Sequence, residues 1–249
     1  MSQAIADREP PAEPPVHTLF QVSTSGALVS GLFGGVVSAA VILQHGDFGL
    51  GTFAGLDGEM IILEGRVYQA KGDGEVLEAG PDAQAPFAVV THFDPEIDTT
   101  LAAAPTLKRL YELCDAQRAS SNLFFAVRLD GRFDSVRTRA VSPAKKHSRL
   151  VDAAKQQHEF MFNDVEGTLI GIWSPGFSSA FSVPGYHFHF LSDDRTQGGH
   201  LLECASRELR LRVEKLTDFH LALPSTEPFL KADLSRNAAA ELAYAEQSH

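Results

Sequence analysis

Cysteine and positive charge are both scarce in this chain of 249 residues. Its two cysteines, Cys114 and Cys204, exclude a disulfide framework, and a single bridge between them is possible but not implied. A reducing cytoplasm is therefore the simplest location. The 21 Lys and Arg residues stand against 32 Asp and Glu residues, which gives a formal net charge of −11. Such a field repels a phosphate backbone, so we do not expect nucleic acid as a partner.

The chain also lacks a convincing membrane-spanning run. The nearest match is the uncharged segment 26–43, which has about the length of a spanning helix, but four glycines and two serines dilute its apolar character. No Lys or Arg lies between Arg8 and Arg66 to set an orientation in a membrane. We expect a buried helix followed by a buried strand there, and no membrane contact. The proline-rich residues 1–16 are expected to be a flexible lead-in rather than a signal peptide.

The remaining composition is that of a globular protein, with 44% hydrophobic and 21% charged residues. Residues 106–120 form the clearest amphipathic helix, while most other segments predict short strands between turn residues. Many strands with few helices indicate an α+β (mixed α/β) fold built on mixed and antiparallel β-sheets. We expect a two-domain subunit, divided into the lead-in 1–16, an N-terminal α/β domain 17–121 and a β-rich C-terminal domain 122–249 that carries a metal site and a C-terminal helix or tail.

Five local elements are predicted at particular residues. Ser and Thr residues cap a helix over 27–32, and the apolar segment 38–43 predicts a strand. Asp57-Gly58 predicts a tight hairpin turn, and Asp130-Gly131 predicts a turn between two further strands. A C-terminal helix is expected within 232–246.

The strongest chemical signal is a histidine pattern. On a strand, His187 and His189 point to the same face, and the turn residues after them predict a hairpin that returns His200 alongside. Three imidazoles from adjacent strands are the protein half of a catalytic zinc site with positions left open. Cys204 would share the His200 face of a regular strand as a soft ligand, but a buried apolar cysteine is favoured. We expect surface or structural roles for the other histidines: His45 and His92 lie near turns, His147 and His158 lie in polar stretches, and His17, His220 and His249 lack partners at ligand spacing.

Motifs along most of the chain resemble the α-acetolactate decarboxylase family. They are LFQVST at 19–24, GDFGLGTF at 46–53, LDGE at 56–59, YQ at 68–69, TRAV at 138–141, and GYHFHFLSDDR at 185–195 followed by GGH at 198–200. The resemblance implies a zinc-dependent lyase that converts (S)-2-acetolactate, a small-molecule substrate, to (R)-acetoin and carbon dioxide. It also implies a two-domain α/β subunit paired as a homodimer.

The resemblance also implies roles for individual residues. The metal ligands of the family match His187, His189 and His200, an active-site glutamate matches Glu59, and an active-site arginine matches Arg139. A second glutamate near the family's C-terminus matches Glu246, with Glu241 as a close competitor. The segment 143–157 departs from the family pattern, so the resemblance does not define the residues at the entrance to the substrate site.

The residues alone support weaker conclusions for two of these positions. Beside Asp57-Gly58, Glu59 is more often a solvated turn acid. Arg137 and Arg139 share a face of a regular strand, so alternation does not choose between them, and the preference for Arg139 comes from the resemblance.

Two other functions fit the same residues. One is another three-histidine metalloenzyme, a hydrolase or hydratase that activates water on its metal. The other is a non-catalytic module that binds a metal or a small ligand on a β scaffold.

Decarboxylation of a β-keto acid with a tertiary hydroxyl has its own requirement, because it leaves an enediolate whose charge must be stabilised. Three neutral imidazoles leave a zinc ion its full +2 charge for that task, and Arg139 is suited to hold the substrate carboxylate.

Overall fold

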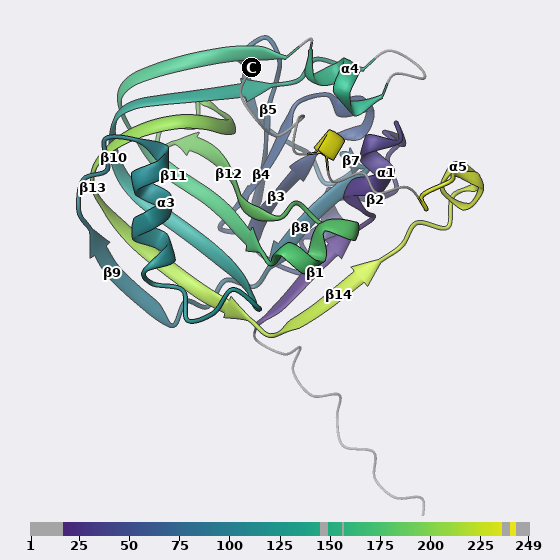
Figure 1. The fold of residues 1–249 in the computed structure, drawn as a ribbon. Helices are drawn as coiled ribbons and strands as arrows, with labels where there is room; N and C mark the ends of the chain where they lie inside the picture. The colour runs from purple at the N-terminus through teal and green to yellow at the C-terminus, as the bar shows by residue number, and fades with distance from the viewer. Residues whose placement is uncertain (1–16, 145–148, 156, 236–239, 243–249) are drawn as a thin grey trace, which may run out of the picture.

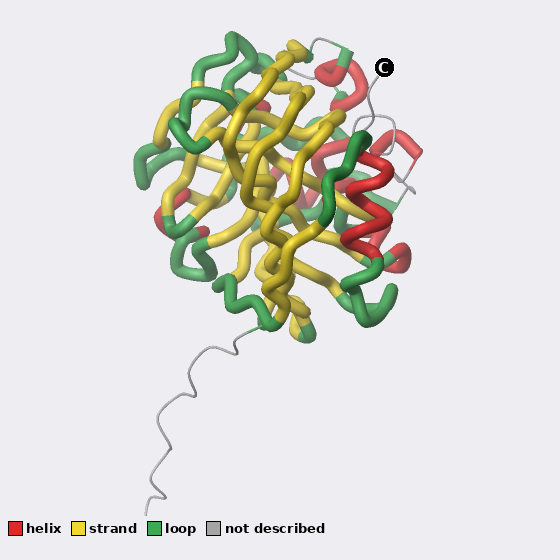
Figure 2. The backbone as a smooth tube through the Cα atoms, turned by 90° about the vertical axis from the view of Figure 1, so that its left-hand side faces the viewer, coloured by secondary structure: helices red, strands yellow, loops and turns green. Residues whose placement is uncertain are grey.

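Strands dominate the computed structural model, which describes residues 17–144, 149–155, 157–235 and 240–242 (Figure 2). The lead-in 1–16 and Glu246 lie outside the described residues. In chain order the elements, with η marking 3₁₀ helices, are β1 (Thr18–Val22), α1 (Ser25–Val29), β2 (Val37–Ser38), α2 (Ala39–Ile42), β3 (Phe48–Thr52), η1 (Ala54–Leu56), β4 (Glu59–Leu63), β5 (Arg66–Ala70), β6 (Val76–Glu78), β7 (Gln84–Ala85), β8 (Phe87–Thr91), β9 (Ile97–Leu101), α3 (Leu107–Asp115), β10 (Phe124–Ala140), α4 (Leu150–Ala154), β11 (His158–Ser174), η2 (Gly176–Ala180), β12 (Gly185–Ser192), β13 (Gly198–Leu216), β14 (Asp218–Ala222) and α5 (Glu227–Lys231).

Two large sheets organise these strands. The first is mixed, in the order β14-β1-β8-β3-β4-β5-β6, with β14 and β1 parallel and the other neighbours antiparallel. The second is antiparallel, in the order β10-β11-β12-β13-β9, and β10 also pairs with β13, so four of its strands close into a ring. The expected α+β class with mixed and antiparallel sheets is confirmed. Strand β9, from the first half of the chain, belongs to the antiparallel sheet, and β14, from the second half, belongs to the mixed sheet. The predicted domain boundary between residues 121 and 122 stays a prediction.

The two sheets pack on each other around a shared apolar core. Leu50, Ile61 and Leu63 of the mixed sheet belong to the same buried cluster as Ile170 and Leu191 of the antiparallel sheet. A second cluster lies under α3, which covers the outer face of the antiparallel sheet (Figure 1). A third cluster lies on the outer face of the mixed sheet. The face that each sheet turns toward the other is therefore the place where residues from both halves of the chain can meet.

Several predicted elements differ from the structure. The strand expected at 38–43 is wrong, because the Ser38 hydroxyl accepts the Val41 N–H and caps the short helix α2. The turn expected at Asp130-Gly131 is also wrong, since β10 runs through it as one strand, and the register shift after Gly131 keeps both neighbours paired. The Asp57-Gly58 turn is part of a longer connection that includes η1. Within the range 232–246, where a C-terminal helix is expected, residues 232–235 are not helical and residues 240–242 are helical, while the rest lies outside the described residues. Helix α5, with a proline in its first turn, precedes this range and is not predicted.

The uncharged segment 26–43 forms two short helices, α1 and α2, with the Thr24 hydroxyl accepting the Ala27 N–H at the start of α1. Within the described part of the chain, no helix is both long and apolar enough to span a membrane. The buried helix expected there is confirmed in α1, while the strand expected after it is replaced by α2.

Candidate metal centre and active site

The histidine hairpin is formed by β12 and β13. Residues 193–197 connect the two strands, and the antiparallel register places His189 directly opposite His200. The ring centroid of His187 lies 5.1 Å from that of His189 and 4.9 Å from that of His200, and the remaining pair is 5.5 Å apart. One ring nitrogen of each residue lies within 4.8 Å of the other two, so the group can bind a metal ion. The predicted hairpin and the convergence of three imidazoles are confirmed.

Hydrogen bonds set the state of these rings. The Nδ1 atom of His189 lies 2.8 Å from the Met60 carbonyl oxygen, which can only accept, so Nδ1 carries the proton and Nε2 keeps its lone pair. Nε2 of His187 lies 3.1 Å from Nδ1 of His200. Burial, together with the charge of Arg139, lowers the pKa of His187 to about 3, so this ring is neutral at physiological pH. Neutral imidazoles with a correctly placed lone pair suit a zinc ion.

A buried ion pair adjoins the histidines. Glu59 begins β4 and is only 7% exposed, and Arg139 near the end of β10 is 5% exposed. One carboxylate oxygen of Glu59 lies 3.7 Å from Nη1 of Arg139, and the other lies 3.6 Å from Nε2 of His189. The glutamate comes from the mixed sheet and its two neighbours from the antiparallel sheet. The alternative of a solvated turn acid is therefore wrong for Glu59, because the facing sheet buries the start of β4.

The structure separates the two arginines that strand alternation left equivalent. Arg137 directs its guanidinium to Glu159 and Glu203 at the surface, with N–O distances of 2.7 and 3.0 Å. Arg139 lies directly opposite His200 in the ladder, beyond a register shift between β10 and β13. The irregular ladder gives the two side chains different surroundings, which a regular period of two does not anticipate.

A cavity joins the ion pair to two of the histidines. One part of its lining is polar and the other is a wall of apolar side chains, which suits a small substrate that has both an anionic group and alkyl groups. Most of these lining residues are not predicted from the sequence. Thr52 could have been predicted, because it pairs with Glu59 across the expected hairpin. The lining residues are Leu28, Gly51, Thr52, Leu56, Glu59, Phe87, Arg139, Val141, Leu150, Val183, His187, His200 and Leu242.

Two further candidates have other partners in the structure. Cys204 packs with Cys114 in the apolar cluster under α3, away from the histidines, and burial raises the pKa of its thiol to about 12. The favoured prediction of a buried apolar cysteine is confirmed, and both cysteines are free. Glu241 pairs with Arg149, which directly precedes α4. Glu246 lies outside the described residues.

Comparison with known proteins shows the family to which the chain belongs. The family model described as alpha-acetolactate decarboxylase matches residues 19–236. An alpha-acetolactate decarboxylase from Methylococcus capsulatus is 40% identical over 222 residues, which cover 89% of this chain and 85% of the relative. One from Klebsiella aerogenes is 39% identical, with 90% and 86% covered. The crystal structure of the Bacillus subtilis strain 168 alpha-acetolactate decarboxylase superposes with a TM-score of 0.90 at 33% identity, covering 93% of this chain and all of that one. The chain belongs to the alpha-acetolactate decarboxylase family.

Proposed function

We propose that this chain is a zinc-dependent carboxy-lyase that converts (S)-2-acetolactate to (R)-acetoin and carbon dioxide. The observation that carries the proposal is the meeting of a three-histidine group with a buried Glu59–Arg139 pair at one cavity. The names of its relatives support the substrate and the reaction. The cavity lining supports both as well, because it offers a cation for the carboxylate and apolar walls for the methyl groups.

His187, His189 and His200 would hold the zinc ion. The donor set fits, because His189 keeps its Nε2 lone pair and His187 is neutral. When bound, the ion supplies Lewis-acid stabilisation for the negative charge that develops on the substrate oxygens. The Met60 carbonyl, from the facing sheet, orients His189 and so ties the group to the strand that carries Glu59.

Arg139 and Glu59 divide the remaining tasks. The guanidinium of Arg139 presents paired donors, so it binds and orients the substrate carboxylate. Loss of carbon dioxide leaves the bonding electron pair on the substrate as an enediolate, which needs a proton on one face to give a single enantiomer of acetoin. Glu59 lies beside both Arg139 and His189 and is our candidate for the group that moves this proton. Glu246, or Glu241 in its place, is the candidate for a second carboxylate.

The decisive test follows acetoin directly. Purified zinc-loaded protein given racemic acetolactate should form acetoin, and a chelator should abolish the product. The His189→Ala variant should lose both zinc and turnover, whereas His158→Ala, which changes an exposed histidine on β11, should keep both. Unchanged acetolactate with zinc demonstrably bound would refute the proposed reaction and favour a hydrolase or hydratase. The homodimer and the cytoplasmic location stay predictions, which gel filtration with light scattering and cell fractionation can check.

A further inference from the structure

Three histidines that lie far apart in the sequence line one cavity. His45 follows α2, His92 follows β8 and His220 lies on β14. The cavity has a volume of about 350 Å³. Its lining is completed by Thr18, Phe20, Gln44, Asp218 and Phe219. Distant segments of the chain bring these three histidines to one cavity, and the surface or structural roles expected for them stay predictions.

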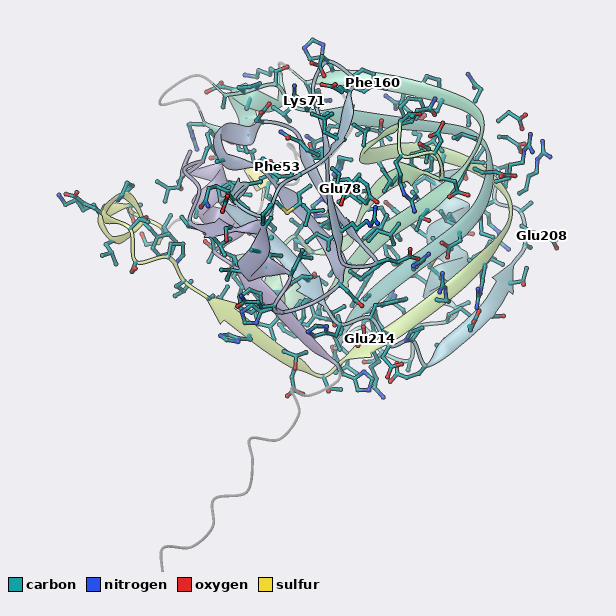
Figure 3. All side chains as sticks on the ribbon, turned by 180° about the vertical axis from the view of Figure 1, so that it is seen from behind. Phe53, Lys71, Glu78, Phe160, Glu208 and Glu214 are labelled. Atoms are coloured by element: carbon teal, nitrogen blue, oxygen red, sulfur yellow. The ribbon has the colours of Figure 1, made fainter. Side chains whose placement is uncertain are left out.

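This cavity is separate from the candidate active site. Strands β3 and β8 lie side by side, and at one end of the pair Thr52 and Phe87 line the active-site cavity. At the opposite end the same strands connect to His45 and His92. Phe87 and His92 are five residues apart, which is roughly 15 Å along a strand. In Figure 3 the two ends are marked by Phe53, just after β3, and by Glu214, whose carboxylate contacts Thr91.

The aromatic floor of the cavity orients the imidazoles. The His45 ring stacks on Phe20 with centroids 3.7 Å apart, and His220 meets the same phenyl ring edge-on at 5.1 Å. The His45 and His220 centroids are 6.2 Å apart with an interplanar angle of 84°, against 4.9–5.5 Å in the three-histidine group of the active site. Asp218 precedes His220 by two residues on β14, so its carboxylate projects from the same face of the strand.

We propose that His45, His92, His220 and Asp218 form a second site, which binds a divalent transition-metal ion of the zinc class. Imidazole nitrogens with one carboxylate oxygen are a suitable donor set for such ions. A cation fits better than an anion, because none of the described residues that line the cavity is Lys or Arg.

The imidazoles of this second site lie farther apart than those of His187, His189 and His200. His92 and His220 are exposed, so their side chains can rotate to close the 6.2 Å separation on an ion. Ordering two exposed side chains costs conformational entropy, and we therefore expect weaker binding than at the buried three-histidine group. The chain's net charge of −11 favours the approach of a cation.

The experiment counts bound zinc on the full chain. Metal-free protein is dialysed to equilibrium against zinc buffered at micromolar free concentration, and zinc per chain is measured by mass spectrometry. The wild type should hold about two ions per chain and the His92→Gln, His220→Gln double variant about one, with acetoin formation unchanged. His45→Phe keeps an aromatic ring on Phe20 and should lose the same ion. His158→Gln, an exposed histidine elsewhere, should keep both.

Three results would overturn the proposal. A wild type that binds one ion lacks the site altogether. A double variant and a His45→Phe variant that both keep the second ion place it elsewhere. Loss of the ion in His158→Gln as well would reveal adventitious binding to surface histidines only.

Discussion

Replacing Arg139 by alanine should nearly abolish turnover while leaving zinc in place. The guanidinium is 5% exposed and lies 3.7 Å from the Glu59 carboxylate, and it is not part of the three-histidine group. The substitution removes the group that we propose to hold the substrate carboxylate. It does not remove a metal ligand.

The structure sets the size of the effect. Hydrogen bonds to charged groups contribute about 1.5–3 kcal/mol each, and a bidentate contact to the substrate carboxylate makes two of them. Unit charges about 4 Å apart near a protein surface interact by about 4 kcal/mol, so the variant also changes the electrostatic setting of Glu59. A combined loss of roughly 3–4 kcal/mol in transition-state stabilisation corresponds to a fall in kcat/KM of about 10²- to 10³-fold.

Arg137 provides the matched control on the same strand. Its ion pairs with Glu159 and Glu203 are at the surface, where such pairs contribute about 0–1 kcal/mol. Arg137→Ala should therefore change kcat/KM by less than about five-fold. Acetoin is assayed at several substrate concentrations, with zinc content and circular dichroism recorded on the same preparations. Equal loss of zinc and turnover in Arg139→Ala would refute the substrate-binding role and make the residue structural. An equal fall in Arg137→Ala would refute the distinction between the two arginines.

Three further predictions concern the proton donor, the pH dependence and the core. Glu59→Gln keeps the shape of the side chain but not its charge, and should lower turnover by about 10²- to 10⁴-fold with zinc content unchanged; turnover within ten-fold of wild type would contradict the role. Burial raises the pKa of Glu214 from 4.5 to about 8. The unfolded chain ionises this carboxyl first, so the free energy of unfolding should fall as pH rises from about 4.5 to about 8; Glu214→Gln should remove this slope in urea titrations, and equal slopes would contradict it. Phe190 is fully buried against Phe133, and Phe190→Ala should lower the free energy of unfolding by about 3–5 kcal/mol in the same assay.

The parts of the site that could be predicted from sequence are local. His187, His189 and His200 lie within fourteen residues, and a strand's period of two together with a hairpin is enough to bring them together. The partnership of Glu59 with His189 joins positions 130 residues apart on different sheets. The alternation of side chains along a strand does not predict such a contact, because the contact depends on how the two sheets pack.

The two errors in the fold have separate causes. At 38–43 the apolar residues fit a strand or a buried helix equally well, and the Ser38 cap together with the burial of Ala39 and Ile42 favours the helix. At Asp130-Gly131 the turn residues are real signals, but β11 and β13 pair with the chain on both sides and absorb the irregularity as a bulge. Tertiary pairing outweighed the local preference at Asp130-Gly131, whereas at 38–43 a local cap and burial selected the helix.

The overall charge makes the local charge of the site informative. A chain of net charge −11 repels an anionic substrate, and the Glu59–Arg139 pair, when both groups are ionised, adds nothing to the balance of the cavity. His187 is neutral and contributes no charge either. A divalent ion on the three histidines would give this pocket a positive excess, because neutral ligands transfer the whole +2 charge to it. Thiolate or carboxylate ligands would have cancelled that excess. Imidazole ligands therefore suit a reaction whose substrate enters as an anion and whose negative charge moves from the carboxylate to the enediolate oxygens as carbon dioxide leaves.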